Sequence, residues 1–306
     1  MKKRFLAALT ALFVCLAILS ACAQNPPAGS SHREGSAGGG EADPSGGGAV
    51  LLTCRIISGG GEGELLLAEQ GQGLYGGTGV YTLSVGQIPV LLDGASASAE
   101  DLEDGMLVEI SCSGMVEETF PARLGGVTAL SAASGADGGF DNLCTLYLQV
   151  LEDLWKVDEG LNQGITELGV DLSRTRLTAS ERSAVAWAFG QAHGLAPVEG
   201  TYEELAEQGY LDPIPASAPA TGSGEEPALY QWEDGCLFSI VENQEDPVVF
   251  SLPNMGPGDE VPAYDGVRFN AQKWCSPLGA YYFSDCTAVS VDGHWNSYTV
   301  GAEAIS

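Results

Sequence analysis

Cys275, His294 and Asp285 are residues of the types that could carry out hydrolytic chemistry together. Some cysteine hydrolases use this chain order of cysteine and histidine, with the histidine deprotonating the thiol and a third group orienting it. Such a thiol usually lies at a helix start, where its pKa falls. Cys275 is instead expected at the end of a strand hairpin, and no group that orients His294 is identifiable. The sequence therefore favours a noncatalytic protein, and a cell-envelope hydrolase using these three residues is the alternative.

Asp285 is also expected on a strand face that is otherwise apolar. A buried carboxylate without a partner is costly, so it needs one. Lys273, Arg268 or the hydroxyls of Tyr281 and Tyr298 could satisfy it within the fold. The alternative is a ligand pocket formed by Asp285, Tyr281 and Tyr298.

The cysteines allow disulfides but predict no metal site. Six remain once two near the N-terminus are set aside: Cys54, Cys112, Cys144, Cys236, Cys275 and Cys286. Strand alternation turns Cys54 and Cys112 towards one core, which permits either a bridge between them or two buried thiols. Cys275 and Cys286 are too far apart along a hairpin to be joined, which leaves Cys144 and Cys236 as candidate partners. No Cys/His spacing fits a metal, and we predict no cofactor.

Residues 49–133 have the short apolar runs and glycine-rich turns of a small β-barrel. Alternation indicates five strands, at 50–57, 64–69, 80–85 with an extension at 89–92, 106–115 and 122–130, and one helical turn at 98–103. Five strands with a helical turn before the fourth predict an OB-like β-barrel.

A family resemblance supports the same fold. Residues 104–110 and 114–122, the second of which contains Thr119-Phe120-Pro121-Ala122, resemble the OB-type domain of uncharacterised lipoproteins from Gram-positive bacteria. The resemblance implies a fold and an extracytoplasmic setting, because the family has no assigned activity. It does not imply nucleic-acid binding, since residues 49–133 contain two basic and eleven acidic residues and a groove that follows phosphates needs the opposite balance.

Gly71–Gly76 has the glycine spacing of a dinucleotide-binding fingerprint. That site requires a helix that opens on the third glycine. Residues 78–85 continue instead with strand-like alternation. We therefore expect Gly71–Gly76 to be a hairpin loop.

Residues 140–306 predict an α+β domain, with helices packed on one face of an antiparallel sheet. Helical periodicity begins after Asp141, and Thr178 with Glu181 and Thr201 with Glu204 form two capping boxes. Strands follow at 167–172, 236–242, 248–252, 267–274, 280–291 and 294–304. Asp292-Gly293 predicts a two-residue hairpin that pairs Val291 with His294, Thr287 with Tyr298 and Asp285 with Val300.

The N-terminus carries an export signal. Lys2, Lys3 and Arg4 precede an apolar run that ends in Leu19-Ser20-Ala21-Cys22. This is the pattern of a lipoprotein signal peptide at residues 1–21. It predicts that Cys22 carries the lipid, including palmitate. Residues 22–48 form a Gly/Ser/Pro linker. The formal net charge of −29 becomes more negative when the signal is removed. Such a surface repels nucleic acid and anionic headgroups, so we expect attachment to the membrane through the lipid alone.

The sequence thus predicts a multidomain, lipid-anchored binding or interaction protein on the outer face of the cytoplasmic membrane. Its partner is an envelope protein or a small ligand of unknown identity.

Overall fold

The computed structural model describes residues 49–215, 229–243, 245, 248 and 263–306. The predicted signal peptide, Cys22, the linker at 22–48 and most of the strand expected at 248–252 lie outside the described residues. The chain from Gly46 to Ser306 forms one compact unit. In the described part of the chain, no helix has the length and apolar character needed to span a membrane.

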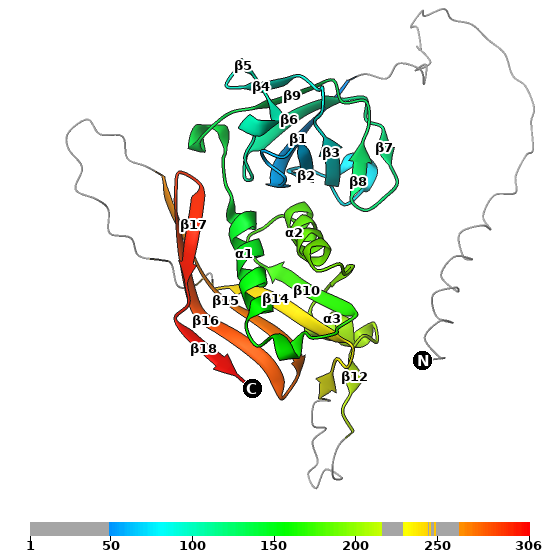
Figure 1. Ribbon diagram of the computed structural model, residues 1–306, viewed down its shortest axis with the longest axis vertical. Helices are drawn as coiled ribbons and strands as arrows, with labels where there is room; N and C mark the ends of the chain where they lie inside the picture. Colours follow the sequence, from blue (N-terminus) through cyan, green and yellow to red (C-terminus); the bar gives the residue numbers. More distant parts are fainter. Residues whose placement is uncertain (1–48, 216–228, 244, 246–247, 249–262) are drawn as a thin grey trace, which may run out of the picture. The chain divides into compact units, whose positions relative to one another are not determined.

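The first sheet contains nine strands from the N-terminal half, coloured blue to green in Figure 1. Their order across the sheet is β5-β4-β9-β6-β1-β2-β3-β8-β7. Strands lie in each of the five expected stretches, and β1 of the first stretch pairs with β6 of the fourth. The strands are β1 (Val50–Ser58), β2 (Glu64–Glu69), β3 (Val80–Ser84), β4 (Val90–Leu92), β5 (Ala95–Ala97), β6 (Leu107–Cys112), β7 (Val116–Glu117), β8 (Ala122–Leu124) and β9 (Ala129–Ala132).

The predicted OB-like barrel is wrong, because this sheet stays open. β5 and β7 lie at the two ends of the strand order and do not pair with each other. The stretch expected to form one strand at 122–130 turns at Gly126, which has a φ of +62°. It gives two strands instead: β8 pairs with β3, whereas β9 pairs with β6 and β4. The two halves of residues 122–130 therefore pair at two separate positions in an open sheet and do not close a barrel.

The second sheet has the order β11-β10-β14-β15-β16-β17, and β18 also pairs with β16 (Figure 1). It is not purely antiparallel as predicted, because β10 runs parallel to both β11 and β14. A helix connects β10 to β11, and such a crossover returns the chain in the same direction. The strands are β10 (Glu167–Arg174), β11 (Pro197–Glu199), β14 (Gly235–Glu242), β15 (Tyr264–Ser276), β16 (Gly279–Val291), β17 (His294–Thr299) and β18 (Ala302–Ile305); β12 (Asp212–Pro213) and β13 (Tyr230–Gln231) form a separate pair.

The helices begin where their capping residues predict. In both predicted capping boxes, a threonine hydroxyl accepts from the backbone of a glutamate whose carboxylate accepts from the threonine N–H, which confirms Thr178 with Glu181 and Thr201 with Glu204. The α-helices are α1 (Leu143–Lys156), α2 (Ala179–Ala192) and α3 (Tyr202–Glu207), and the short 3-10 helices are η2 (Leu74–Gly76), η3 (Ala99–Asp101), η4 (Ala136–Gly138) and η5 (Glu159–Leu161). Asp141 contributes at the start of α1 by accepting from the Leu143 N–H at 3.0 Å.

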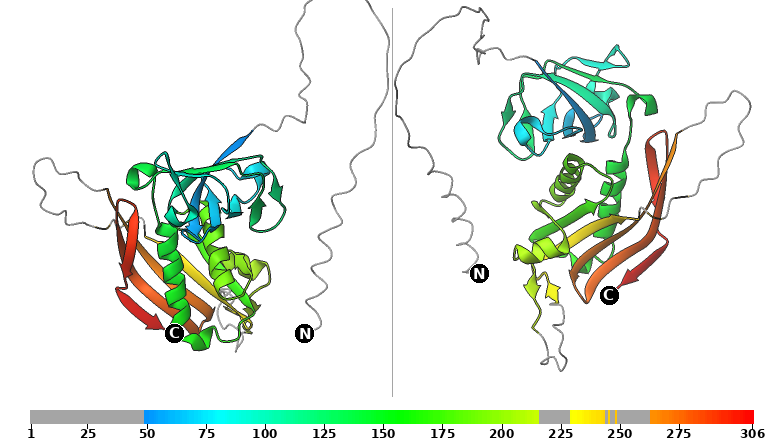
Figure 2. Two further views of the ribbon diagram at one scale, coloured as in Figure 1. Left: turned by 45° about the horizontal axis from the view of Figure 1, so that its top comes forward. Right: turned by 180° about the vertical axis from the view of Figure 1, so that it is seen from behind.

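The predicted α+β domain is also wrong. Strands dominate the described residues, which contain only three α-helices. α1 lies against β14, β15 and β17 (Figure 2), whereas α2 contacts β1, β2 and β3 of the first sheet as well as β10. One apolar core accordingly joins residues of both helices to Ile57, Leu66 and Val80 of the first sheet. Because the two helices share their apolar faces between two sheets, they do not form a layer that covers one sheet.

The Asp292-Gly293 hairpin is confirmed at its tip and shifted further along. Val291 lies opposite His294 as predicted, but a bulge places Tyr298 opposite Ala288 rather than Thr287. The expected pairing of Asp285 with Val300 is absent, because β17 ends at Thr299 and β18 begins at Ala302. Asp285 lies in this interruption with a φ of +53°.

Candidate binding site

Cys275, His294 and Asp285 do not form one site. Cys275 is joined by a disulfide to Cys236 on the neighbouring strand, with 4.6 Å between their Cα atoms. Trp274 lies opposite Ala280 and His294 lies opposite Val291, which separates Cys275 from His294 by roughly 36 Å along β16 at the usual rise. The ring of His294 stacks on Phe140 with 4.2 Å between the ring centroids.

Asp285, Tyr281 and Tyr298 also point to different partners. The Asp285 side chain is exposed, and its N–H donates to Asn270 Oδ1 at 2.9 Å. The Tyr281 hydroxyl donates to Glu303 at 2.6 Å, and the Tyr298 hydroxyl donates to Asp153 of α1 at 3.0 Å. None of the three lines the polar cavity or the apolar groove described below.

Cys54, Cys112, Cys144 and Cys286 are buried and unbridged. Cys54 lies opposite Val108 and Cys112 lies opposite Val50, so the two are four positions apart along paired strands. Burial raises the pKa of Cys54, and it raises the pKa of Cys286 to about 12. Cys54 and Cys286 are therefore protonated at neutral pH, and all four cysteines belong to the core.

Lys273 is a buried cation, although the sequence suggested it only as a partner for Asp285. Its side chain is fully buried on the inner face of β15, and the ammonium group donates to the Val157 carbonyl, to the Asp158 carbonyl at 3.0 Å and to Asn162 Oδ1 at 2.6 Å. Burial lowers the pKa of Lys273 to about 8. It was a candidate partner for Asp285, but its three acceptors lie in the loop after α1. The signal was present in the sequence, since alternation puts Lys273 on the same face as Phe269 and Ala271.

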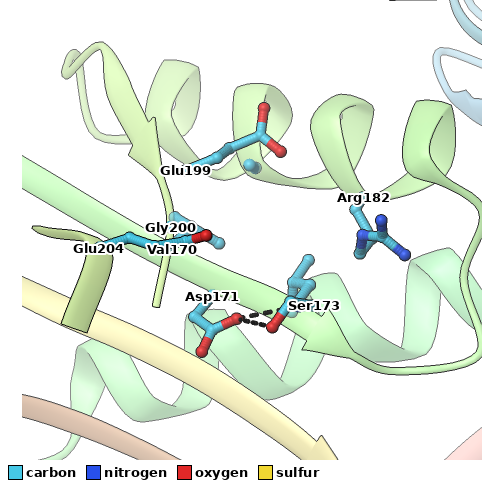
Figure 3. Close-up of a pocket in the computed structure, with 9 residues that line it drawn as sticks. Val170, Asp171, Ser173, Arg182, Glu199, Gly200 and Glu204 are labelled. Carbon is cyan, nitrogen blue, oxygen red and sulfur yellow. Dashed lines mark hydrogen bonds between the residues drawn. The ribbon is translucent and has the colours of Figure 1, made fainter. Parts of the chain in front are cut away.

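A polar cavity of about 200 Å³ lies between β10, α2 and the segment that leads into α3 (Figure 3). Its polar groups already have partners within the protein. Asp171 Oδ1 accepts from the N–H and the hydroxyl of Ser173, Ser183 donates to Glu199, and Arg182 donates to the Leu177 carbonyl. These bonds hold the charged side chains of this cavity in place, and its volume is smaller than that of the groove in the first sheet.

A larger and more apolar groove lies in the first sheet. It has a volume of about 460 Å³ and runs between the loop that precedes β3 and the loop that joins β7 to β8. We call it the apolar groove; it is lined by Leu74, Gly76, Gly77, Thr78, Gly79, Val80, Tyr81, Val116, Glu117, Glu118, Thr119, Phe120 and Ala122. Phe120 is 49% exposed beside it. An exposed aromatic side chain at a mostly apolar concave surface is typical of a binding site.

Hydrogen bonds fix the loop on one side of the apolar groove. The Leu74 N–H donates to the Tyr81 hydroxyl at 2.9 Å, and that hydroxyl donates to Glu69 at 2.7 Å. Burial raises the pKa of Tyr81, which keeps the hydroxyl protonated as a donor. At Gly79 a side chain would meet Ser180 Oγ at 2.5 Å, and its φ is +70°. The predicted hairpin loop at Gly71–Gly76 is thus part of a preformed wall.

Known proteins give no guide to the occupant of this groove. Neither a protein-family model, nor a curated protein, nor a solved structure matches the chain. The candidate site therefore rests on its own geometry. Within the residues that the structure describes, no group of three or more His, Cys, Asp and Glu side chains could hold a metal ion.

The sequence did not identify the apolar groove as a site, although it singled out two of its parts. The glycine spacing of Gly71–Gly76 and the motif at 119–122 each drew attention to one wall. Only the parallel pairing of β3 with β8 brings these walls together, since Tyr81 lies opposite Ala122 across 41 residues of chain. No local pattern encodes that contact.

Proposed function

We propose that the protein is a lipid-anchored, extracytoplasmic binding protein that receives the apolar part of its ligand in the apolar groove. The observation that carries this proposal is the groove itself, a concave apolar surface with a fixed wall and an exposed Phe120. The proposed location is inferred from the sequence, where the export signal ends at Cys22 and a Gly/Ser/Pro linker follows.

The noncatalytic part of the proposal is supported by the state of the reactive groups. The Cys275 sulfur is bonded to Cys236 and is not a free thiol. A nucleophilic cysteine needs a thiolate and a nearby base. The four unbridged cysteines among the described residues are buried, so none of these four is exposed to a substrate.

Binding of Nile red, a neutral apolar dye, tests the use of the groove. We expect saturable binding to the wild-type protein and about tenfold weaker binding to Phe120→Ala, because truncation of a ring that contacts the dye removes roughly 1.4 kcal/mol of binding free energy. Leu278→Ala is the matched control, since Leu278 is also an exposed apolar side chain, at 88% exposure, and lies outside the groove. Equal affinity of the two variants, or no saturable binding, would contradict the proposal.

The anchor is tested separately by Cys22→Ala. Loss of the thiol that carries the lipid is expected to move the protein from the membrane fraction to the medium. Fractionation followed by immunoblotting measures this, with Cys54→Ala as a control that keeps the lipid site. Retention of Cys22→Ala in the membrane fraction would sink the assignment of the lipid to this residue.

A further inference from the structure

β7, which contributes Val116 and Glu117 to the second wall of the apolar groove, is an edge strand. β7 pairs on one side with β8, where Val116 lies opposite Leu124 and Glu117 lies opposite Arg123. It is the last strand in the order of its sheet, so no strand within the described residues pairs with its other side. The backbone groups along such an edge can accept an added strand.

Three of the lining residues have no side chain. Gly76, Gly77 and Gly79 supply three positions of the first wall. A Cβ atom at Gly76 would meet nothing within 4 Å, so another polypeptide can approach the main chain closely at this position. Gly76 and Gly79 have φ values of +74° and +70°, which favour glycine over other residues.

The groove carries a negative charge on one rim. Glu117 and Glu118 are both exposed there, and no lysine or arginine is among the lining residues. The whole chain has a formal net charge of −29. Such a rim attracts cationic groups and repels phosphates and carboxylates.

We propose that the apolar groove binds an extended polypeptide segment whose apolar side chains are flanked by lysine or arginine. The segment adds to the edge of β7, its apolar side chains fill the space beside Phe120, and its cationic side chains lie against Glu117 and Glu118. This inference rests on the proposed function and names the class of ligand. A polypeptide fits better than a small apolar molecule, because only a polypeptide uses the strand edge, the open backbone at Gly76 and the acidic rim together.

Fluorescence anisotropy with labelled synthetic peptides tests the inference. One peptide has the core Val-Phe-Val flanked by lysines, and its partner has the same core flanked by glutamates. The wild-type protein is expected to bind the lysine peptide saturably and the glutamate peptide at least about tenfold more weakly. No saturable binding of the lysine peptide would overturn the inference.

Charge reversal locates the effect at the rim. The double variant Glu117→Lys/Glu118→Lys is expected to lose the preference for the lysine peptide. Glu100→Lys/Glu103→Lys is the matched control, because both of these glutamates are exposed, in η3 and in the loop after it, and lie outside the groove. Thermal unfolding of both variants checks that they fold. An unchanged preference in a folded Glu117→Lys/Glu118→Lys variant would contradict the assignment.

A third peptide tests strand addition. N-methylation of alternate backbone nitrogens in the lysine peptide removes its N–H donors on one edge, and we expect about tenfold weaker binding. Unchanged affinity would show a cationic amphiphile site and overturn the polypeptide assignment. If Nile red still binds in a manner that depends on Phe120 while no peptide binds, this inference fails and the proposed function stands.

Discussion

The surroundings of Lys273 contain a buried charge, whereas the apolar groove contains an exposed aromatic ring. Around Lys273, a charged group is fully buried and donates to three oxygens, from Val157, Asp158 and Asn162. In the groove, an aromatic ring is half exposed and a strand edge has no partner among the described strands. The hydrogen-bonded polar groups around Lys273 stabilise the fold. The exposed ring and the strand edge at the groove remain available to a ligand.

The difference assigns separate roles to the two regions. Substitutions around Lys273 should change the free energy of unfolding, and substitutions in the groove should change binding with little effect on unfolding. Each prediction below tests one side of this division.

The largest effect on stability is expected for Lys273→Met. Methionine keeps most of the side-chain volume but leaves three oxygens, one of them on the buried Asn162, without this donor, so the free energy of unfolding should fall by about 3 kcal/mol. Chemical denaturation measures it. Lys156→Met is the control, because the Lys156 side chain is 64% exposed and pairs with Asp153 only at 3.5 Å, and a change of less than ~0.5 kcal/mol is expected. Equal effects of the two substitutions would show that Lys273 is not a structural cation.

A smaller effect with a pH signature is expected for Glu181→Gln. The Glu181 side chain is 8% exposed, accepts from Arg55 Nε at 3.0 Å and closes the capping box with Thr178. Burial alone would raise the pKa of Glu181, but the Thr178 N–H, the Gln70 amide and Arg55 outweigh burial and hold the pKa below its ordinary value of 4.5. Loss of these charge-assisted bonds should cost about 2 kcal/mol at pH 7.

The sign of the pH dependence follows from the lowered pKa. The carboxylate of Glu181 stabilises the fold above pH 4.5, the value of its unfolded state, and this contribution is lost as the pH falls through the lower pKa of the folded state. The difference in unfolding free energy between the wild type and Glu181→Gln should therefore shrink in acid. Glu204→Gln, in the exposed capping box of α3, should show a difference of less than ~0.5 kcal/mol at every pH. A gap for Glu181→Gln that stays constant in acid would contradict this account.

Local features of the fold could be predicted from the sequence. Capping boxes at Thr178 and Thr201 and the hairpin at Asp292-Gly293 depend on residues within one turn of each other, and all three are confirmed. The chemistry of a few neighbouring residues decides such features.

Long-range features could not be predicted in the same way. Closure of the first sheet depends on where the two halves of residues 122–130 pair, and the role of the helices depends on which sheets share their apolar faces. The Cys236–Cys275 disulfide depends on the register of β14 against β15 across a sequence separation of 39. The apolar groove could not be predicted for the same reason, since its walls meet only through the contact of β3 with β8.

Hydrogen–deuterium exchange of the wild-type protein, with and without the lysine-flanked peptide, tests the central claim most directly. The account predicts slower exchange of backbone amides in residues 74–81 and 116–122, which line the groove, and unchanged exchange in β15 around Lys273. Saturable binding of the peptide with protection elsewhere, and none at the groove, would contradict it.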